Sequence, residues 1–376
     1  MFCLPAFPTA ALVPRLRCGW MRCDGIARGV KRAQGVLLAV FLAAVSVSVD
    51  HAHAENSVQD FYAKHQIRFV IGSAGGGGYD FYSRLVGRYM TKHLPGHPTL
   101  VMQNMPGAAG VTAANYLYNV AQHDGSEIGM VGRAVGTLPL LDPKAKGPRY
   151  VATKLNWIGS PQQEDGLVLA RTSTNIKTLD DLKTRQLLVS GTSKGSPPSF
   201  YPNLFNALFG TKFKVIEGYK GSQAALLALE RGEVEGHVSG SSAAPFRARI
   251  ASWIKDGSVG IVAQIALKKD PEYPDVPLIL DLAKTEQQRD IMKLVLTQQV
   301  MAWPIVAPPD VPAERVAALR NAFDAVMKDP EFLAEAKKQN LVIDPVRGTE
   351  IAKLLEHAYG APKDIINPIR KVAEED

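Results

Sequence analysis

Short apolar runs alternate with amphipathic helices along the first half of the chain. Ile67–Ile71 is rich in β-branched and aromatic residues, which predicts a buried strand. After it, apolar residues recur at the spacing of one helix face until Pro95-Gly96 ends the helix. The alternation continues with a strand at Thr99–Gln103, a helix at Ala109–Val120 and a strand at Ile128–Val131. This order predicts parallel strands joined by right-handed crossovers.

The same alternation repeats further along the chain. The expected strands and helices of this second set are Leu187–Ser190, Phe200–Phe209, Lys214–Glu217, Ser222–Glu230, Val234–Val238, Ala244–Lys255 and Val259–Gln264. Loops near Ser160–Asp165 and Lys268–Pro277 separate the sets, because prolines interrupt regular structure in the second loop. The remaining chain predicts helices at Glu286–Gln298, Ala313–Met327, Glu331–Gln339 and Thr349–Ala358, and a strand at Val300–Val306. The pattern predicts an α/β protein with two lobes.

Residues 1–54 have the pattern of a secretory signal peptide. The basic stretch Arg28–Arg32 precedes the apolar run Val36–Val49, and Ala52-His53-Ala54 offers small residues for cleavage before Glu55. The apolar run is short for a membrane span, so an uncleaved anchor is the weaker alternative. We therefore expect export to the periplasm and cleavage between Ala54 and Glu55.

Removing this segment changes what the charge implies. Residues 1–54 hold six of the 43 Lys and Arg and two of the 36 Asp and Glu, so the net charge falls from +7 to +3. No long basic run remains, and we expect no nucleic-acid partner. All three cysteines precede residue 55, which excludes disulfides and thiol chemistry in the mature chain. Residues 1–20 are unusual before a signal, which makes Met21 an alternative start.

A glycine-rich loop between the first strand and its helix is the strongest candidate site. It consists of Ser73, Ala74, Gly75, Gly76, Gly77, Gly78, Tyr79 and Asp80. Glycines let several backbone N–H groups converge on an anion at a helix N-terminus. The loop lacks the Gly-Lys-Ser/Thr of a P-loop and the G-x-G-x-x-G of dinucleotide sites. Asp80, expected as the N-cap, would also repel a polyphosphate. The loop therefore favours a carboxylate, with no cofactor; a loop without a ligand is the alternative.

Other segments add candidate ligand contacts. The candidates are Ala108 in Pro106–Gly110, Arg133 after the third strand, Thr192, Ser193, Lys194, Gly195 and Ser196 after Leu187–Ser190, and Ser241 in Ser239–Ser242. Hydroxyls and N–H groups can hold an anion, and Lys194 or Arg133 can neutralise one. Tight helix–sheet packing is the alternative for Pro106–Gly110, and solvated surface charge is the alternative for Lys194 and Arg133.

The second of these loops also matches a catalytic pattern. Gly191–Gly195 fits the nucleophile elbow G-x-S-x-G, with Ser193 as the nucleophile. A nucleophile elbow requires a helix that begins directly after the serine, and we expect Pro197-Pro198 to delay the start of this helix. His237 falls in an expected strand, where a core histidine is usual, and His357 on a helix with charged neighbours. No histidine pair has H-E-x-x-H spacing. We expect no enzymatic activity and no metal, with a secreted serine hydrolase as the alternative.

Short motifs spread along the chain resemble a known family. They are Ile67–Val70 with Gly76–Asp80 and Arg84, Asn104–Gly110, Asp124-Gly125, Gly191–Ser196, Tyr219–Ser222, Gly232–Val234 and Tyr273–Pro277. In this order and spacing, nearly the whole mature chain resembles the solute receptors of tripartite tricarboxylate transporters, the Bug-type receptors. The extra glycines of the first loop, Gly132–Ala134 and Lys194 depart from the family pattern, which leaves the identity of the ligand open.

The resemblance implies a type II periplasmic-binding-protein fold, with two Rossmann-like lobes and a ligand cleft between them. Residues 55–163 plus 267–376 would form lobe 1, and residues 164–266 lobe 2. It also implies an extracytoplasmic receptor that holds a small di- or tricarboxylate, or a similar organic acid, between the loops Ser73–Asp80 and Gly191–Ser196. The implied partners are two integral membrane transporter subunits, and we expect a monomeric receptor. A ligand sensor for a signalling receptor is a further alternative.

Overall fold

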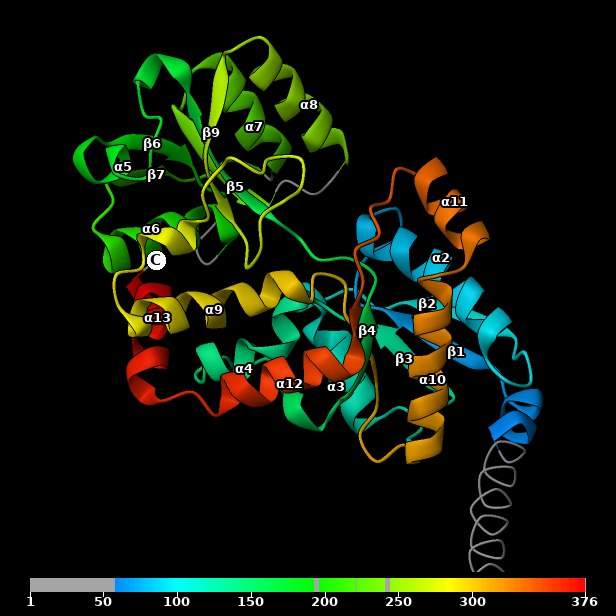
Figure 1. The fold of residues 1–376 in the computed structure, drawn as a ribbon. Helices are drawn as coiled ribbons and strands as arrows, with labels where there is room; N and C mark the ends of the chain where they lie inside the picture. The colour runs from blue at the N-terminus through cyan, green and yellow to red at the C-terminus, as the bar shows by residue number, and fades with distance from the viewer. Residues whose placement is uncertain (1–57, 193–195, 221, 241–243, 376) are drawn as a thin grey trace, which may run out of the picture. The chain divides into compact units, whose positions relative to one another are not determined.

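The computed structural model describes residues 58–192, 196–220, 222–240 and 244–375 (Figure 1). Residues 56–376 form one compact unit. The predicted signal peptide lies outside the described residues, as do Ser193, Lys194, Gly195 and Ser241. In the described ranges, no helix combines the length and the apolar character needed to cross a membrane.

The first sheet has six strands in the order β11-β4-β10-β3-β1-β2. Its strands are β1 (Ile67–Ile71), β2 (Leu100–Asn104), β3 (Glu127–Met130), β4 (Asn156–Ser160), β10 (Ile305–Ala307) and β11 (Val346–Arg347). The helices that belong with it are α2 (Gly78–His93), α3 (Val111–Asn119), α10 (Ala313–Val326), α11 (Pro330–Lys338) and α12 (Gly348–Tyr359). β1 is parallel to β2 and to β3, which confirms the predicted crossovers, and β10 is antiparallel to β3 and β4.

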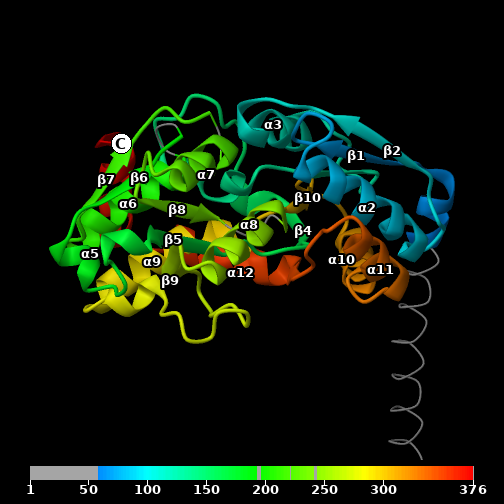
Figure 2. The same ribbon diagram turned by 90° about the horizontal axis from the view of Figure 1, so that it is seen from above.

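The second sheet has five strands in the order β7-β6-β8-β5-β9. Its strands are β5 (Gly166–Arg171), β6 (Leu187–Ser190), β7 (Phe213–Ile216), β8 (Gly236–Gly240) and β9 (Val259–Ile265). The helices in this part of the chain are α5 (Asp181–Thr184), α6 (Pro197–Phe209), α7 (Ser222–Arg231) and α8 (Ala244–Lys255). β6 is parallel to β7 and β8, whereas β5 is antiparallel to β8 and β9. Figure 2 shows α2, α10 and α11 grouped with the first sheet and α5, α6 and α7 with the second.

The chain passes from one sheet to the other twice. It leaves β4 for β5 through residues 161–165, and it leaves β9 for β10 through residues 266–304, which include α9 (Glu286–Val300). In each sheet, the strand that the chain enters after a crossing is antiparallel to its neighbours, β5 in the second sheet and β10 in the first. This topology confirms the expected two-lobed α/β fold class, and both predicted linker loops fall on the crossings.

The C-terminal helix packs with the second sheet. Ile369 of α13 (Lys363–Glu375) and Leu296 of α9 share one buried cluster with Val168 of β5 and Phe205 of α6. Figure 1 shows α13 and α9 beside α6. The short helix α4 (Leu138–Leu141) contributes Leu140 to the same cluster. The predicted residue ranges of the two lobes stay a prediction.

Two local predictions were wrong, and two strands were not predicted. Helix α6 begins at Pro197 rather than Phe200, because proline fits the first turn of a helix, where its missing N–H needs no partner. The prolines therefore do not delay the helix, and that argument against a nucleophile elbow fails. The strand predicted at Val300–Val306 is shorter, since α9 continues to Val300 and β10 covers only Ile305–Ala307. β4 and β5 had no predicted counterpart.

Candidate ligand-binding site

Three loops meet backbone to backbone at the C-terminal ends of β1, β2 and β3. A Cβ atom added to Gly72 would lie 3.2 Å from the Cα of Gly110 and 3.1 Å from the carbonyl oxygen of Met130. A Cβ on Gly110 would overlap the backbone of Gly132, and one on Gly132 would overlap the carbonyl of Ala109. These contacts bring the glycine loop, residues 107–110 and residues 132–133 to one edge of the sheet. Open parallel sheets bind ligands at this edge.

The loop after β2 is held in an unusual backbone conformation. Ala108 and Ala109 have φ values of 44° and 51°, in the left-handed region, and Gly107 and Gly110 also have positive φ. Each alanine costs on the order of 1 kcal/mol there, and such conformations concentrate at ligand sites. Residues 107–109 are exposed while Gly110 is buried against Gly132. The loop thus packs tightly and still presents exposed backbone near Ala108.

Asp80 fixes the shape of the glycine loop. It is not the N-cap that the sequence predicted, because α2 begins at Gly78 with Gly77 at the cap and Asp80 in the first turn. The buried Asp80 carboxylate accepts hydrogen bonds from Gly76 N–H (3.0 Å), Arg84 Nε (3.0 Å) and Asn104 Nδ2 (2.9 Å). These partners, Arg84 first, lower the pKa of Asp80 to about 2. Its negative charge is thus matched within the loop.

The backbone of the loop tip is open to solvent. Residues 74–77 are exposed, whereas Ser73 and Gly78 are half-buried. Asn104 Nδ2 also donates to the carbonyl of Ser73 (3.0 Å), so the loop is tied down at both ends. The Gly76 N–H is taken by Asp80, and the exposed backbone of residues 74–77 lies at the N-terminus of α2, where the helix dipole favours negative charge.

Aromatic side chains form one wall beside the loop. The Tyr79 hydroxyl donates to the carbonyl of Ala302 (3.1 Å) and accepts from the backbone N–H of Arg133 (3.1 Å). The ring of Trp303 lies 4.5 Å from that of Tyr79 and 4.8 Å from that of Tyr82. The Nε1 of Trp303 is buried without a hydrogen-bond partner among the described residues. Trp303 was not predicted, because it lies on the returning segment between α9 and β10, where no motif marks it.

Arg133 has a partner that the sequence did not suggest. It begins a short turn, Arg133–Gly136, after β3, and its guanidinium forms an ion pair with Glu164 in the first crossing. The backbone N–H of Glu164 donates to the carbonyl of Gln299 on α9 (2.9 Å). The Gln299 amide in turn lies 3.0 Å from the hydroxyl of Tyr201 on α6. Arg133 is therefore not a solvated surface charge.

The loop after β6 is described only at its ends. A Cβ on Gly191 would lie 2.5 Å from Val215 and 2.7 Å from Glu217, so glycine is required there. Thr192 Oγ1 donates to Ser196 Oγ (2.8 Å), which lies 3.2 Å from Ser199 Oγ at the start of α6. These hydroxyls gather at the N-terminus of a helix, as expected for an anion contact. The predicted contacts Ser193, Lys194, Gly195 and Ser241 lie outside the described residues.

A buried serine–histidine pair lies below this loop. Ser190 Oγ and His237 Nδ1 are 2.8 Å apart at the ends of β6 and β8, and both side chains are buried. Burial lowers the pKa of His237 to about 4, so the ring is neutral near pH 7. His237 is thus a core histidine, as its strand position predicted, and His357 is exposed on α12. In the described ranges, no group of three His, Cys, Asp or Glu side chains is placed to hold a metal ion.

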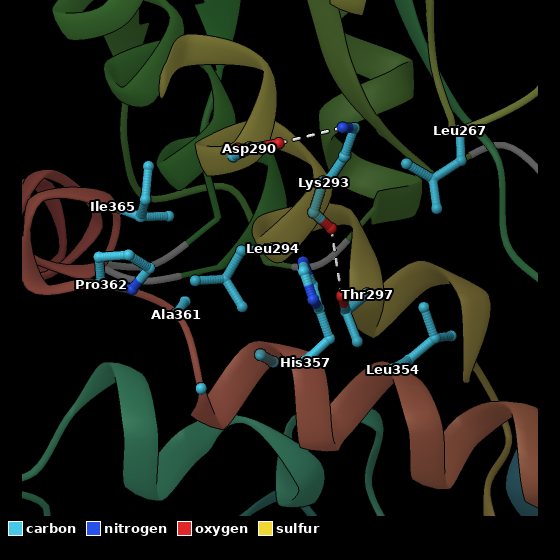
Figure 3. A pocket seen from close by; sticks show the side chains of 12 residues that line it. Leu267, Asp290, Lys293, Leu294, Thr297, Leu354, His357, Ala361, Pro362 and Ile365 are labelled. Atoms are coloured by element: carbon cyan, nitrogen blue, oxygen red, sulfur yellow. Dashed lines mark hydrogen bonds and ion pairs between the residues drawn. The ribbon is translucent and has the colours of Figure 1, made fainter. Parts of the chain in front are cut away.

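Two cavities lie away from these loops, on the side of α9 and α12. One of about 460 Å³ has mainly apolar walls from α9, α12 and the start of α13. Figure 3 shows His357 reaching from α12 toward Thr297, and Lys293 paired with Asp290 at 3.0 Å. The second, of about 570 Å³, shares Leu354 and His357 with the first. Neither cavity includes a predicted site residue, and neither offers the converging N–H groups of the glycine loop.

Sequence comparison places the chain among transporter receptors. Residues 83–369 match the model of the tripartite tricarboxylate transporter family receptor. A UPF0065 protein of Agrobacterium vitis is 26% identical over 279 residues, which cover 72% of this chain and 74% of that protein. A UPF0065 protein of Bordetella bronchiseptica is 25% identical over 315 residues, which cover 82% of this chain and 84% of that protein.

Solved structures share the fold. A TctC solute-binding protein from Polaromonas, solved without ligand, has a TM-score of 0.65 at 16% identity and covers 84% of this chain and 100% of its own. A protein of R. palustris solved with adipate has a TM-score of 0.56 at 18% identity, with coverages of 83% and 98%. MatC from Rhodopseudomonas palustris with bound malate has a TM-score of 0.51 at 21% identity, with coverages of 81% and 99%.

Two α/β lobes joined by two crossings are the fold that this chain shares with the solved solute-binding proteins. Within that class, the chain belongs to the tripartite tricarboxylate transporter receptor family, as the motif resemblance predicted. The family and the structural neighbours are solute-binding proteins rather than enzymes.

Proposed function

We propose that this protein is an extracytoplasmic receptor that binds a small organic carboxylate at the glycine loop and presents it to two integral membrane subunits of a tripartite transporter. The observation that carries the proposal is the exposed backbone of residues 74–77 at the N-terminus of α2, held by Asp80. Because Arg84 already neutralises Asp80, the loop can accept a single negative charge without repulsion from its own carboxylate.

The ligands bound to two structural neighbours support an organic acid as the ligand of this protein. Adipate and malate, which occupy two of them, are both dicarboxylic acids. The hydroxyls of Thr192 and Ser196 give the second lobe polar groups of the kind that complete such a site. We propose that the predicted contacts Ser193, Lys194, Gly195 and Ser241 join them when the lobes close around the acid, a hinge motion common in two-lobed receptors.

The place of action follows from the N-terminal pattern. We propose that residues 1–54 direct the chain to the periplasm, are removed there, and leave a monomeric receptor. N-terminal sequencing of the protein recovered from the periplasmic fraction should begin at Glu55. A mature protein that begins at or before Met21 would contradict this part of the proposal.

Binding can be tested with the purified protein and a panel of mono-, di- and tricarboxylates in a thermal-shift assay. At least one acid should raise the Tm in a concentration-dependent way, because a ligand that binds only the folded state stabilises it. Ala74→Glu should weaken binding of that acid at least tenfold, because it places a negative charge in the exposed loop.

The matched control is Val120→Glu, which adds the same charge at a site 68% exposed and outside the three loops; it should bind like the unaltered protein. A panel without a single stabilising acid would overturn the proposal. Ester hydrolysis that disappears in Ser193→Ala would instead establish the hydrolase alternative.

A further inference from the structure

The ion pair between Arg133 and Glu164 lies where several parts of the site meet. Arg133 follows β3 beside the glycine loop, and its own N–H is bound by the Tyr79 hydroxyl of that loop. Glu164 belongs to the crossing between β4 and β5 and is bound through its N–H to Gln299 of α9. The pair therefore connects the first sheet, the crossing and the returning helix.

The charge of Arg133 also reaches the second lobe. Burial raises the pKa of the Tyr201 hydroxyl on α6, and the positive charge of Arg133 opposes that rise. Tyr201 is fixed by its hydrogen bond with the Gln299 amide (3.0 Å). Arg133 therefore contacts Tyr79 of the glycine loop and acts through its charge on Tyr201 of α6, the helix in the second lobe that begins at Pro197.

Both charged groups of the pair are largely shielded from water. The side chain of Glu164 is 16% exposed and that of Arg133 is 27% exposed. A positive charge attracts a nearby carboxylate, and a negative charge beside it repels the same carboxylate to a similar extent. A ligand carboxylate that approaches Arg133 therefore meets a compensating repulsion from Glu164. A neutral polar group has no such penalty and can accept from Arg133 while it donates to Glu164.

We propose that the Arg133–Glu164 pair is a specificity element that makes this receptor select small monoanionic acids with a neutral or zwitterionic far end, such as a hydroxyl, an amide or an amino-acid head group, over dicarboxylates. This inference rests on the proposed function, because the glycine loop supplies the contact for the single carboxylate. Glu164 then acts as a built-in competitor for any second carboxylate at Arg133.

The test compares acids that differ only at the far end. Dissociation constants of the purified protein are measured by titration calorimetry for succinate against succinamate and for adipate against adipamate, at constant ionic strength. The unaltered protein should prefer each monoamide at least tenfold. Glu164→Gln removes the competing charge and should reverse the preference, with dicarboxylate affinity at least tenfold higher than in the unaltered protein.

Two further variants separate charge from folding. Glu331→Gln makes the same change in an exposed ion pair with Lys92 on α2 and should leave both affinities unchanged. Arg133→Gln/Glu164→Gln removes both charges and keeps similar side-chain volumes, so it should fold even if Glu164→Gln alone does not. In this double variant, the preference between diacid and monoamide should fall to within about twofold.

The possible failures are distinguishable. A diacid-to-monoamide ratio that is the same in the unaltered protein, Glu164→Gln and the double variant would overturn the specificity role and leave the proposed receptor function standing. A tenfold preference of the unaltered protein for the diacid would do the same. Failure to bind any acid of the wider panel would overturn the receptor function, and this inference with it.

Discussion

Gly78 lies against the ring of Trp303, so closely that a Cβ atom at residue 78 would come within 2.6 Å of the Cη2 atom of Trp303. Trp303 also contacts Tyr79 and Tyr82, which lie three residues apart on one face at the start of α2. The indole therefore sets the position of the helix N-terminus that the glycine loop presents.

Replacement of Gly78 by alanine should destabilise the protein by about 1–3 kcal/mol, because the added methyl group overpacks against a ring that the neighbouring tyrosines hold in place. Chemical denaturation measures the change. Gly75→Ala is the matched control in the same loop, since its Cβ would meet only Asp80 Oδ2 at 3.9 Å. Gly78→Ala/Trp303→Leu should recover most of the loss. Equal stabilities for the two single alanine variants would refute the packing argument.

Gly132→Ala should have a larger effect, roughly 3 kcal/mol, because the new methyl group would overlap the backbone carbonyl of Ala109, which no side-chain rotation can relieve. The loop after β2 would have to move, and acid affinity should fall at least tenfold. Gly260→Ala, where a Cβ meets nothing within 4 Å, should leave stability and affinity nearly unchanged. If Gly132→Ala binds its acid normally, the loops at residues 107–110 and 132–133 do not shape the site.

Asp80 should contribute to acid sensitivity. Its pKa of about 2 is lower than in an unfolded chain, so its stabilising effect is present above about pH 4 and is lost as the pH falls toward 2. Asp80→Asn should cost about 1–2 kcal/mol at pH 7, a value reduced because Arg84 is half-exposed. The variant should also lack the part of the stability loss between pH 4 and 2 that the unaltered protein shows. Asp275→Asn, at an exposed position, should behave like the unaltered protein.

His237 should limit stability in a higher pH range. Its pKa of about 4 is below the value of about 6.5 expected in an unfolded chain, so the unfolded state binds the proton more readily between these values. Stability should therefore fall by about 3 kcal/mol as the pH is lowered from 6.5 to 4.

His237→Gln should flatten this part of the stability profile, although it is less stable at pH 7. His65→Gln changes an exposed histidine and should keep the slope. An unchanged slope in His237→Gln would show that other groups carry the effect.

The local pattern of apolar and turn residues was sufficient to predict strands that such residues mark at both ends. Ile67–Ile71 and Leu187–Ser190 were predicted to the residue, because buried parallel strands are continuous apolar runs with turn residues on either side. β5, the antiparallel strand that the chain enters after its first crossing, was missed. Its sequence, Gly166–Arg171, is no less apolar, but its identity as a strand depends on β8 and β9, which come later in the chain.

The same distinction between local sequence and tertiary contacts applies to the candidate site. The sequence by itself determined the family and the place of the glycine loop, because these depend on motif spacing and on a strand followed directly by a helix. It could not reveal that Asp80 is neutralised by Arg84, that Trp303 covers Gly78, or that Arg133 is paired with Glu164. The last two join residues brought together only when the chain has crossed between the sheets. Charge balance at a site is a sum over spatial neighbours, so only the tertiary structure could decide it.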